Sequence, residues 1–189
     1  TRGYQPWRRA FHAMNGSLVV LALTWFQLPL TTALMVLGII LALAFLLDLL
    51  RLLDPKVNVL FFRTFSSLAS PREEKGIASS TWYALSIFAV LILFPRDYAL
   101  SGILVLAWAD PSANLVGQLW GRRRFLSGTV LGTATFFLTA FLALVVFVPW
   151  PSAVLVAAVT AVAEALPAKV DDNLLVPLTV ACSLSLLAL

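Results

Sequence analysis

Residues 98–124 read YALSGILVLAWADPSANLVGQLWGRRR, and this stretch decides the fold. An apolar run of about 20 residues that ends in a cluster of arginines is typical of a helix that crosses a membrane and ends at its cytoplasmic face. The run also contains Asp110 and Asn114. An ionisable side chain at membrane depth is costly and is therefore a candidate functional residue. The stretch predicts both a membrane span and a polar site inside it.

The composition of the whole chain agrees with a membrane protein. Of its 189 residues, 61% are hydrophobic and 12% are charged, whereas a soluble domain has about 45–50% and roughly 25%. This excludes a water-soluble globular protein and, because disorder needs low hydrophobicity, a disordered chain. Residues 1–189 are expected to form a single domain. One cysteine and one histidine exclude a disulfide framework, a cysteine-based metal site and a metal centre with several histidines.

Long apolar runs in lipid must become helices, because hydrocarbon offers no hydrogen bonds to the backbone. We expect an all-α, polytopic integral membrane bundle of about seven transmembrane helices. Their approximate ranges are 13–27, 31–50, 80–94, 98–119, 128–148, 151–166 and 174–189. In the long loop, residues 55–70 carry apolar side chains at spacings of three and four, which predicts an amphipathic helix lying in the membrane interface.

The basic residues predict a cytoplasmic N-terminus. In that orientation 12 of the 13 Lys and Arg residues face the cytoplasm and only Arg96 lies outside, as the positive-inside rule requires. The cytoplasmic set is Arg2, Arg8, Arg9, Arg51, Lys56, Arg63, Arg72, Lys75, Arg122, Arg123, Arg124 and Lys169. The net charge of +4 then belongs to one face of a membrane protein and gives no reason to expect nucleic-acid binding. Because the chain begins with Thr1 rather than Met, we expect residues upstream of it; its start has no cleavage site typical of a signal peptide.

The first polar group lies at the start of the first span. Arg8, Arg9 and His12 share one helical face. They could contact a phosphate, or they could anchor the helix at the interface by snorkelling.

The second group precedes the third span. Glu73 and Glu74 are interpreted as solvated loop charges, with Lys75 beside them. The hydroxyl cluster Ser79–Thr81, followed by Trp82 and Tyr83, is a stronger site candidate.

The third group lies on the span that opened this section. One helical face carries Asp110, Asn114, Gly117, Gln118 and Gly121. Small residues let a ligand approach the backbone, and Arg122, Arg123 and Arg124 stand at the mouth. The alternative is an Asp–Asn pair between helices, together with an ordinary cytoplasmic cluster of positive charge.

Two further groups complete the pattern. Ser127, Gly128 and Thr129 open the fifth span, where a helix N-terminus favours an anion, although small residues also serve helix packing. Glu164 ends the sixth span, and Asp171–Asn173 open the seventh. Carboxylates near phosphates suit Mg²⁺, whereas Asp172 or Asn173 could instead cap the last helix.

Arginines for phosphate and carboxylates for a divalent metal are the groups that phosphoryl or nucleotidyl transfer needs. A transporter is the alternative, because intramembrane carboxylates also form ion relays. A relay needs polar groups in both halves of the bilayer, yet the outer half has only Arg96 and Asp97 as charges. This asymmetry favours an enzyme open to the cytoplasm.

The motifs resemble those of the dolichol kinase/phytol kinase family of CTP-dependent polyprenol (lipid-alcohol) kinases, whose bacterial members are often labelled phosphatidate cytidylyltransferase-like. The matching segments, in chain order, are Arg8-Arg9-x-x-His12, Glu74 to Tyr83, Asp110-Pro111-x-Ala113-x-x-x-Gly117-x-x-x-Gly121-Arg122, Ser127-Gly128-Thr129, and Glu164-Ala165-Leu166-Pro167 with Asp172-Asn173-Leu174-x-Val176-Pro177. One departure is Ser127, which stands where the family has glutamate.

The resemblance implies CTP as phosphate donor, Mg²⁺ as cofactor and a polyprenol-, phytol- or dolichol-type alcohol as acceptor. The products would be a lipid phosphate and CDP, formed at the cytoplasmic face of a bacterial inner membrane. Asp110, Glu164 and Asp172 would be catalytic and would bind the metal, with Asp110 acting as ligand or as base. The implied nucleotide-binding residues are Arg9, His12, Asn114, Gly117, Gly121, Arg122, Arg123, Arg124, Ser127, Gly128, Thr129 and Asn173. Further candidates are Glu74, Lys75, Ser80 and Thr81.

Two other functions stay open at this point. The runner-up is CDP-lipid synthesis of the phosphatidate cytidylyltransferase kind, and the second alternative is a non-enzymatic transporter. The expected partners are CTP, a membrane lipid alcohol and the bilayer, with no nucleic acid. The oligomeric state is open, a homodimer being one option.

Overall fold

The computed structural model describes residues 6–167 and 170–188, and helices form nearly all of its regular structure. In chain order the elements are α1 (Pro6–Thr24), α2 (Leu30–Leu53), α3 (Pro55–Thr64), the 3-10 helix η1 (Pro71–Lys75), α4 (Ser79–Leu93), α5 (Arg96–Leu119), β1 (Arg124–Phe125), β2 (Gly128–Thr129), α6 (Val130–Leu144), α7 (Trp150–Ala165) and α8 (Asp172–Leu187). The two strands form a small antiparallel hairpin that joins α5 to α6.

Each of the seven segments predicted to span the membrane is a helix. Some helices extend further than predicted, into charged sequence beside the apolar run. α1 begins at Pro6 instead of near residue 13, so Arg8, Arg9 and His12 lie inside the helix. α2 continues to Leu53 because Asp48 and Arg51, which lie beyond or near the end of the apolar run, pair with each other. Hydropathy locates the apolar part of a helix. It misses terminal helical turns that carry charged side chains when other residues of the fold pair with those charges.

The loop predicted as an amphipathic helix over 55–70 contains a shorter helix. α3 ends at Thr64 and none of its residues is buried. Its start is well defined, since the Asp54 side chain accepts a hydrogen bond of 2.8 Å from the Lys56 backbone N–H and Pro55 occupies the first turn. The chain then forms η1 before α4 begins.

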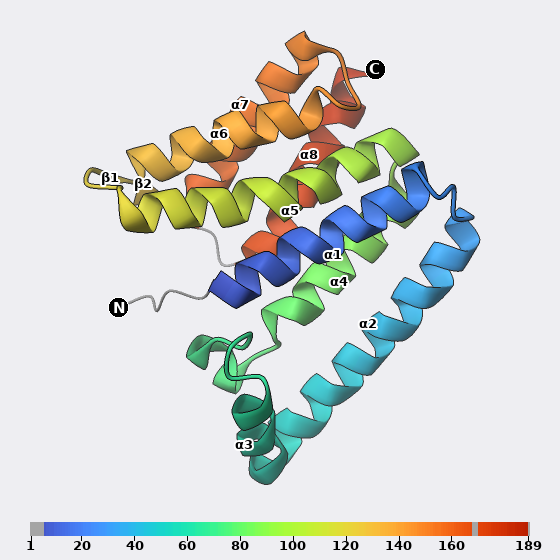
Figure 1. The fold of residues 1–189 in the computed structure, drawn as a ribbon, viewed down its shortest axis with the longest axis vertical. Coiled ribbons are helices and arrows are strands. Elements are labelled where there is room, and N and C mark those ends of the chain that lie inside the picture. The colour runs from blue at the N-terminus through green and yellow to red at the C-terminus, as the bar shows by residue number, and fades with distance from the viewer. Residues whose placement is uncertain (1–5, 168–169, 189) are drawn as a thin grey trace.

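α5 is the central element of the bundle. It packs against α1, α4, α6 and α8, and Figure 1 shows it lying between α6 and α1. Its buried side chains are mostly small or aliphatic, from Ala99 to Ala113. Close approach is explicit at Gly102, where an added Cβ would lie 2.8 Å from the Pro177 carbonyl oxygen of α8. The core therefore forms around one helix that touches four others.

Side-chain contacts fix the direction of the neighbours of α5. The Arg96 guanidinium donates to the Leu23 carbonyl, and Trp108 Nε1 donates to Ser17 Oγ at 3.0 Å. As residue numbers fall along α1 they rise along α5, so the two helices are antiparallel. The start of α1 therefore lies beside the second half of α5, which carries Asp110.

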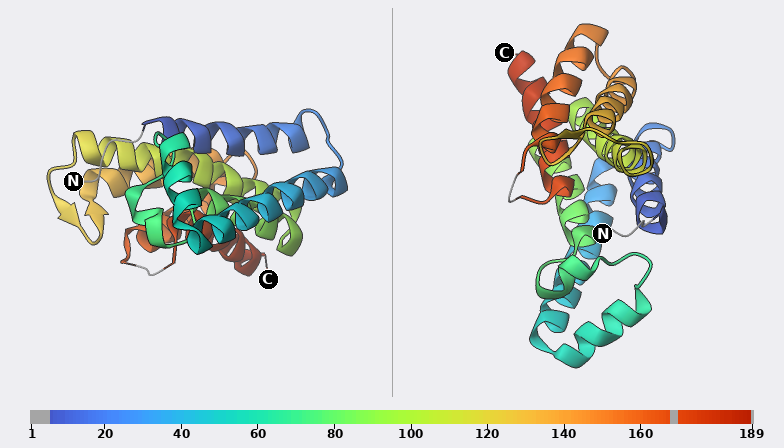
Figure 2. Two further views of the ribbon diagram at one scale, coloured as in Figure 1. Left: turned by 90° about the horizontal axis from the view of Figure 1, so that it is seen from below. Right: turned by 90° about the vertical axis from the view of Figure 1, so that its left-hand side faces the viewer.

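Within the described residues, two helices, α2 and α5, are long and apolar enough to cross a membrane, judged by length and composition, and four further apolar helices are shorter. The apolar stretch of α5 is mostly buried in the bundle, whereas that of α2 is mostly exposed. Figure 2 shows α3 and the adjoining end of α2 projecting beyond the main bundle. Apart from the short β1–β2 hairpin, the described elements are thus helical, and two of them are candidate membrane spans.

Candidate functional site

Residues from three distant parts of the sequence meet around Asp110. Arg8 and Arg9 of α1, and Asp171 and Asp172 at the start of α8, all act electrostatically on its carboxylate. The antiparallel packing of α1 on α5 and the contact of Gly102 with Pro177 explain this convergence. The structure therefore brings Asp110 and Asp172, both predicted to be catalytic, close to Arg9, a predicted nucleotide contact, and to Arg8, which was not among the predicted nucleotide-binding residues.

The Asp110 side chain is oriented by its own helix. Asn114 Nδ2 donates to Asp110 Oδ1 at 2.8 Å and to the Asp110 carbonyl oxygen at 3.0 Å. The two residues are one helical turn apart, so this Asp–Asn pair lies within α5 and does not join two helices as the structural alternative required. Pro111 follows Asp110 inside the helix and removes one backbone donor from this turn.

His12 is buried and ties three helices together. Its side chain hydrogen-bonds to Asn173 of α8, and its ring packs against Tyr83 of α4 with 4.4 Å between the ring centroids. The Tyr83 hydroxyl donates to the His12 backbone carbonyl at 2.6 Å. Interfacial snorkelling is therefore wrong as the explanation of His12, and Tyr83 joins the site.

Asp171 caps α8. Its Oδ1 accepts from the Asn173 backbone N–H at 3.0 Å and from Asn173 Nδ2 at 2.7 Å. The alternative that Asp172 or Asn173 would be the cap is wrong by one or two residues. Asp172 instead lies in the first turn of α8, where it is exposed. Its carboxylate is thus not used as the helix cap.

Glu73 is the glutamate that faces the site. It is 8% exposed, its Oε1 lies 3.2 Å from Arg8 NH1, and Ser79 Oγ donates to the same oxygen at 2.9 Å. The interpretation of Glu73 as a solvated loop charge is wrong, because η1 turns it inward. Its neighbours Glu74 and Lys75, which the motif had singled out, are exposed, and so is Ser80.

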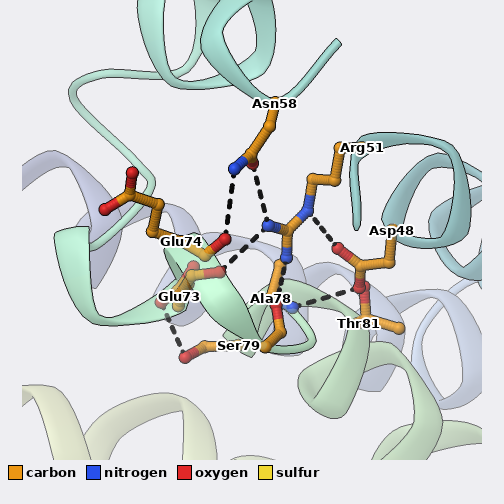
Figure 3. Close-up of polar contacts among 9 residues, drawn as sticks. Asp48, Arg51, Asn58, Glu73, Glu74, Ala78, Ser79 and Thr81 are labelled. Atoms are coloured by element: carbon orange, nitrogen blue, oxygen red, sulfur yellow. Dashed lines mark hydrogen bonds and ion pairs between the residues drawn. The ribbon is translucent and has the colours of Figure 1, made fainter. Parts of the chain in front are cut away.

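A buried ion pair that sequence reasoning missed supports Glu73. Asp48 and Arg51 of α2 are 3% and 1% exposed, and Arg51 Nε donates to Asp48 Oδ1 at 2.6 Å. Arg51 also donates to the backbone carbonyls of Glu73 and Gly76. Figure 3 shows its guanidinium at the centre of this cluster. From the sequence, Arg51 was interpreted only as a cytoplasmic charge. The one feature that could have indicated a buried ion pair was Asp48, three residues earlier on the same apolar helix.

The Asp48 carboxylate is bonded on its other side to α4. Asp48 Oδ2 accepts from the Ala78 backbone N–H at 3.0 Å and from Thr81 Oγ1 at 2.6 Å. Thr81, a predicted site residue, thus holds the start of α4 in place. Asn58 of α3 completes the cluster by donating to the Glu74 carbonyl at 3.1 Å.

The glycines of the α5 stripe are used in packing. An added Cβ at Gly117 would lie 3.0 Å from Thr129 Oγ1, and one at Gly121 would collide with the same side chain. Thr129 in turn caps α6 by accepting from the Gly132 N–H at 3.1 Å. This contact lies inside the chain, and the homodimer option gains no support from it. The nucleotide role predicted for Gly117 and Gly121 stays a prediction.

Ser127 is bonded to α7. Its backbone N–H and its hydroxyl both donate to the Ala165 carbonyl, at 3.0 and 2.9 Å. The hairpin thereby lies against the end of α7, where Glu164 is half-buried. The Ser127 N–H is thus engaged within the fold, while Gly128 is half-buried and stays a predicted phosphate contact.

The three arginines after Gly121 lie at the surface. Arg122, Arg123 and Arg124 are all exposed, on the connection to β1 and on β1 itself. They follow the end of α5 beyond Asp110, and their nucleotide role stays a prediction.

Asp110 and Asp172 suit a metal ion whose remaining ligands are the phosphates of a substrate. Within residues 6–167 and 170–188, no three or more His, Cys, Asp or Glu side chains form a metal site by themselves. Asp110 and Asp172 are close enough to act on each other electrostatically. One or two carboxylates, completed by substrate phosphates and water, are what Mg²⁺ commonly takes.

Comparison with known proteins gives a consistent result. No family model and no solved structure matches the chain. A CTP-dependent diacylglycerol kinase of Saccharomyces cerevisiae is 29% identical over 112 residues, which are 56% of this chain and 39% of that protein. The Schizosaccharomyces pombe protein of the same name is 26% identical over 165 residues, 76% of each chain. The chain is related to CTP-dependent lipid kinases.

A phytol kinase of Synechocystis agrees with this relationship to lipid kinases. It is 46% identical over 57 residues, which cover 28% of this chain and 24% of that protein. These relatives confirm the family resemblance drawn from the motifs and are consistent with a CTP-dependent phosphotransferase. The chain spans about two fifths of the Saccharomyces kinase and three quarters of the Schizosaccharomyces kinase.

Proposed function

We propose that this chain is a CTP-dependent lipid-alcohol kinase, which transfers the γ-phosphoryl group of CTP to a membrane alcohol and releases CDP. The observation that carries the proposal is the convergence of Arg8, Arg9, Asp110 and Asp172 from three helices. Phosphoryl transfer depends mainly on positioning and on charge neutralisation, and this cluster offers both signs of charge side by side.

Seven transmembrane helices with a cytoplasmic N-terminus are part of the proposal. Exposed tryptophans support it, because indoles gather at both membrane interfaces. Trp7 and Trp120 lie at the end of the bundle that holds the site and are 69% and 63% exposed. Trp25, just after α1, and Trp150, at the start of α7, lie at the other end of the bundle and are 80% and 68% exposed. The site would then open to the cytoplasm, in the inner membrane of a bacterium. Of the basic residues on which the orientation rests, Arg2 and Lys169 lie outside the described residues.

Mg²⁺ would be held by Asp110 and Asp172 together with the phosphates of CTP, and Glu164 would bind it directly or through water. The ion would neutralise the charge of the phosphates. Arg8 and Arg9 would bind the phosphate oxygens from the α1 side. The exposed Arg122, Arg123 and Arg124 would attract the nucleotide at the mouth of the site.

The chemical step requires a base for the acceptor hydroxyl. Its oxygen attacks the γ-phosphorus while the bond from that phosphorus to the β–γ bridging oxygen breaks, so that CDP leaves with the electron pair. Asp110, whose carboxylate is oriented by Asn114, would accept the hydroxyl proton as the alternative to holding the metal. The contacts among Asn173, His12 and Tyr83 would hold α8, α1 and α4 in fixed positions around the reacting groups.

The acceptor has two candidate classes. The motif resemblance favours a polyprenol-, phytol- or dolichol-type alcohol, whereas the two yeast relatives are named diacylglycerol kinases. Each is a hydroxyl on an apolar tail that would lie among exposed apolar helices such as α2.

Two labels of CTP test the function. Purified protein in lipid nanodiscs with Mg²⁺ should transfer label from γ-³²P-CTP to diacylglycerol, phytol or a polyprenol, and none from α-³²P-CTP. With phosphatidate added to the nanodiscs as a further acceptor, label from the α position in the lipid would indicate CDP-lipid synthesis, and no labelled lipid from either form of CTP would reject both enzymes. Asp110→Asn should abolish transfer, whereas Asp97→Asn, which removes an exposed carboxylate at the other end of α5, should not.

A further inference from the structure

We propose that Glu73 is a positioning residue: its carboxylate, held by Ser79 and by a turn anchored on Arg51 and Asp48, fixes the Arg8 guanidinium beside Asp110 so that it meets the phosphates of the nucleotide. This inference rests on the proposed function and deepens it. The motif comparison had selected the neighbouring Glu74, so the assignment comes from the contacts alone.

The first step is the ion pair itself. Arg8 NH1 lies 3.2 Å from Glu73 Oε1, and both side chains are largely shielded from water, with 24% and 10% of their surfaces exposed. Arg8 also acts electrostatically on Asp110 and on His12. An arginine side chain has many rotamers, and fixing one geometry costs conformational entropy. A partner that holds the guanidinium before the nucleotide arrives reduces that cost at the moment of binding.

The second step is that Glu73 is itself fixed on two sides. Ser79 Oγ, in the first turn of α4, donates to the same Oε1 at 2.9 Å. Ser79 Oγ also lies 3.4 Å from Asp171 Oδ2. The hydroxyl thus links the Glu73 carboxylate to the cap of α8, the helix that carries Asp172.

The third step is the anchoring of the turn that carries Glu73. Arg51 NH1 donates to the Glu73 carbonyl at 2.9 Å, and Arg51 NH2 donates to the Gly76 carbonyl. Asp48 holds Arg51 on one side and the Ala78 N–H on the other, as Figure 3 shows. A five-residue 3-10 helix has little stability of its own, and this buried pair supplies the contacts that keep it in one place.

The chain of contacts therefore runs from α2 through η1 to α1 and ends at the Asp110 cluster. Charge follows the same path with alternating sign, from Asp48 to Arg51, and from Glu73 to Arg8. The Arg51 guanidinium also lies 4.9 Å from the Phe61 ring centroid of α3, so α3 covers the buried pair. Neither α2 nor α3 contributes a residue to the predicted site, yet both help to place Arg8.

Kinetics on Glu73→Gln test the inference. Glutamine keeps the size of the side chain and an oxygen for Ser79, but it loses the charge that holds Arg8. The KM for CTP should rise about tenfold, as the loss of a charged hydrogen bond allows, while kcat at saturating CTP changes much less. Asp97→Asn, which removes one negative charge far from the site, is the matched control and should leave both constants unchanged.

A double-mutant cycle with Arg8→Gln makes the coupling explicit. If Glu73 acts through Arg8, Glu73→Gln in the Arg8→Gln background should add almost nothing to the KM for CTP. Ser79→Ala is the second variant: it leaves the charge but frees the carboxylate, and it should raise the same KM by a smaller factor. A thermal unfolding curve for each variant checks that the protein is folded.

The outcomes separate the inference from the function beneath it. A wild-type protein that transfers no phosphate from CTP removes the proposed function and this inference together. A wild-type protein that is active, with Glu73→Gln as efficient as the Asp97→Asn control or with independent effects of the Glu73 and Arg8 substitutions, overturns the inference and leaves the function standing.

Discussion

Asp48 and Arg51 are charged residues whose burial is tolerated because both charged groups have hydrogen-bond partners. Arg51 donates to a carboxylate and to two carbonyls, and Asp48 accepts from Arg51, from a backbone N–H and from a hydroxyl. Such a pair contributes little net stability when intact, but removing one partner leaves an uncompensated charge. Its role here is to define the position of η1 and α4.

Arg51→Met should therefore destabilise the protein by about 3–5 kcal/mol, the usual cost of breaking a buried pair. Thermal unfolding in a mild detergent measures the change. Arg63→Met is the matched control, because Arg63 of α3 is exposed, and it should shift the midpoint little. Equal midpoints for the two variants would contradict the structural role given to Arg51.

The residues around Asp110 show which site residues can be predicted from the sequence and which cannot. Asp110 and His12 stand out because a polar side chain on an apolar helix needs a reason. Glu73 does not stand out, since a glutamate in a charged loop segment is ordinarily solvated. Only the fold of η1 directs Glu73 toward Arg8 while Glu74 points to solvent, and a one-residue choice of this kind depends on tertiary contacts.

At the level of elements, hydropathy located all seven long helices, because apolar runs have few other ways to satisfy their backbone. It gave the wrong start for α1 and a late end for α6. The start of α1 depends on charges that the bundle compensates, and α6 ends at Leu144 before its apolar sequence does. The hairpin was not predicted, since its two-residue strands carry no periodic signal.

The contact of α5 with α8 should be sensitive to a single methyl group. At Gly102 an added Cβ would lie 2.8 Å from the Pro177 carbonyl oxygen and 3.2 Å from the Pro177 Cα, and backbone atoms cannot rotate away. Gly102→Ala should cost about 1–3 kcal/mol, as overpacking does. It should also lower kinase activity, because α8 carries Asp172 toward Asp110.

Gly76→Ala is the control for Gly102→Ala, because nothing lies within 4 Å of an added Cβ at Gly76 and its backbone does not need glycine. Thermal unfolding and the labelled-CTP assay on the same preparations measure both effects. If Gly102→Ala matched Gly76→Ala in stability, the close packing of α5 on α8 would be wrong.

For the whole molecule, the arrangement gathers charge at one end of the bundle. The starts of α1, α4 and α8 and the second half of α5 meet at the Asp110 cluster, joined by Arg8, Ser79 and Asp172. The opposite end carries Arg96, whose guanidinium donates to the Leu23 carbonyl. A bilayer across this bundle would place every predicted site residue on one side, which suits a water-soluble nucleotide and a lipid acceptor meeting at an interface.

The orientation of the bundle can be measured with single cysteines. In a Cys182→Ser background, Asp97→Cys at the start of α5 should react with a membrane-impermeant maleimide in intact spheroplasts. Lys56→Cys on α3 should react only in inverted vesicles, because α3 and the site lie on the cytoplasmic side in the proposed topology. Both side chains are exposed, so access to the reagent is set by the membrane and not by the fold. Labelling of Lys56→Cys in intact spheroplasts, with Asp97→Cys protected, would reverse the orientation and place the site on the face where CTP is absent.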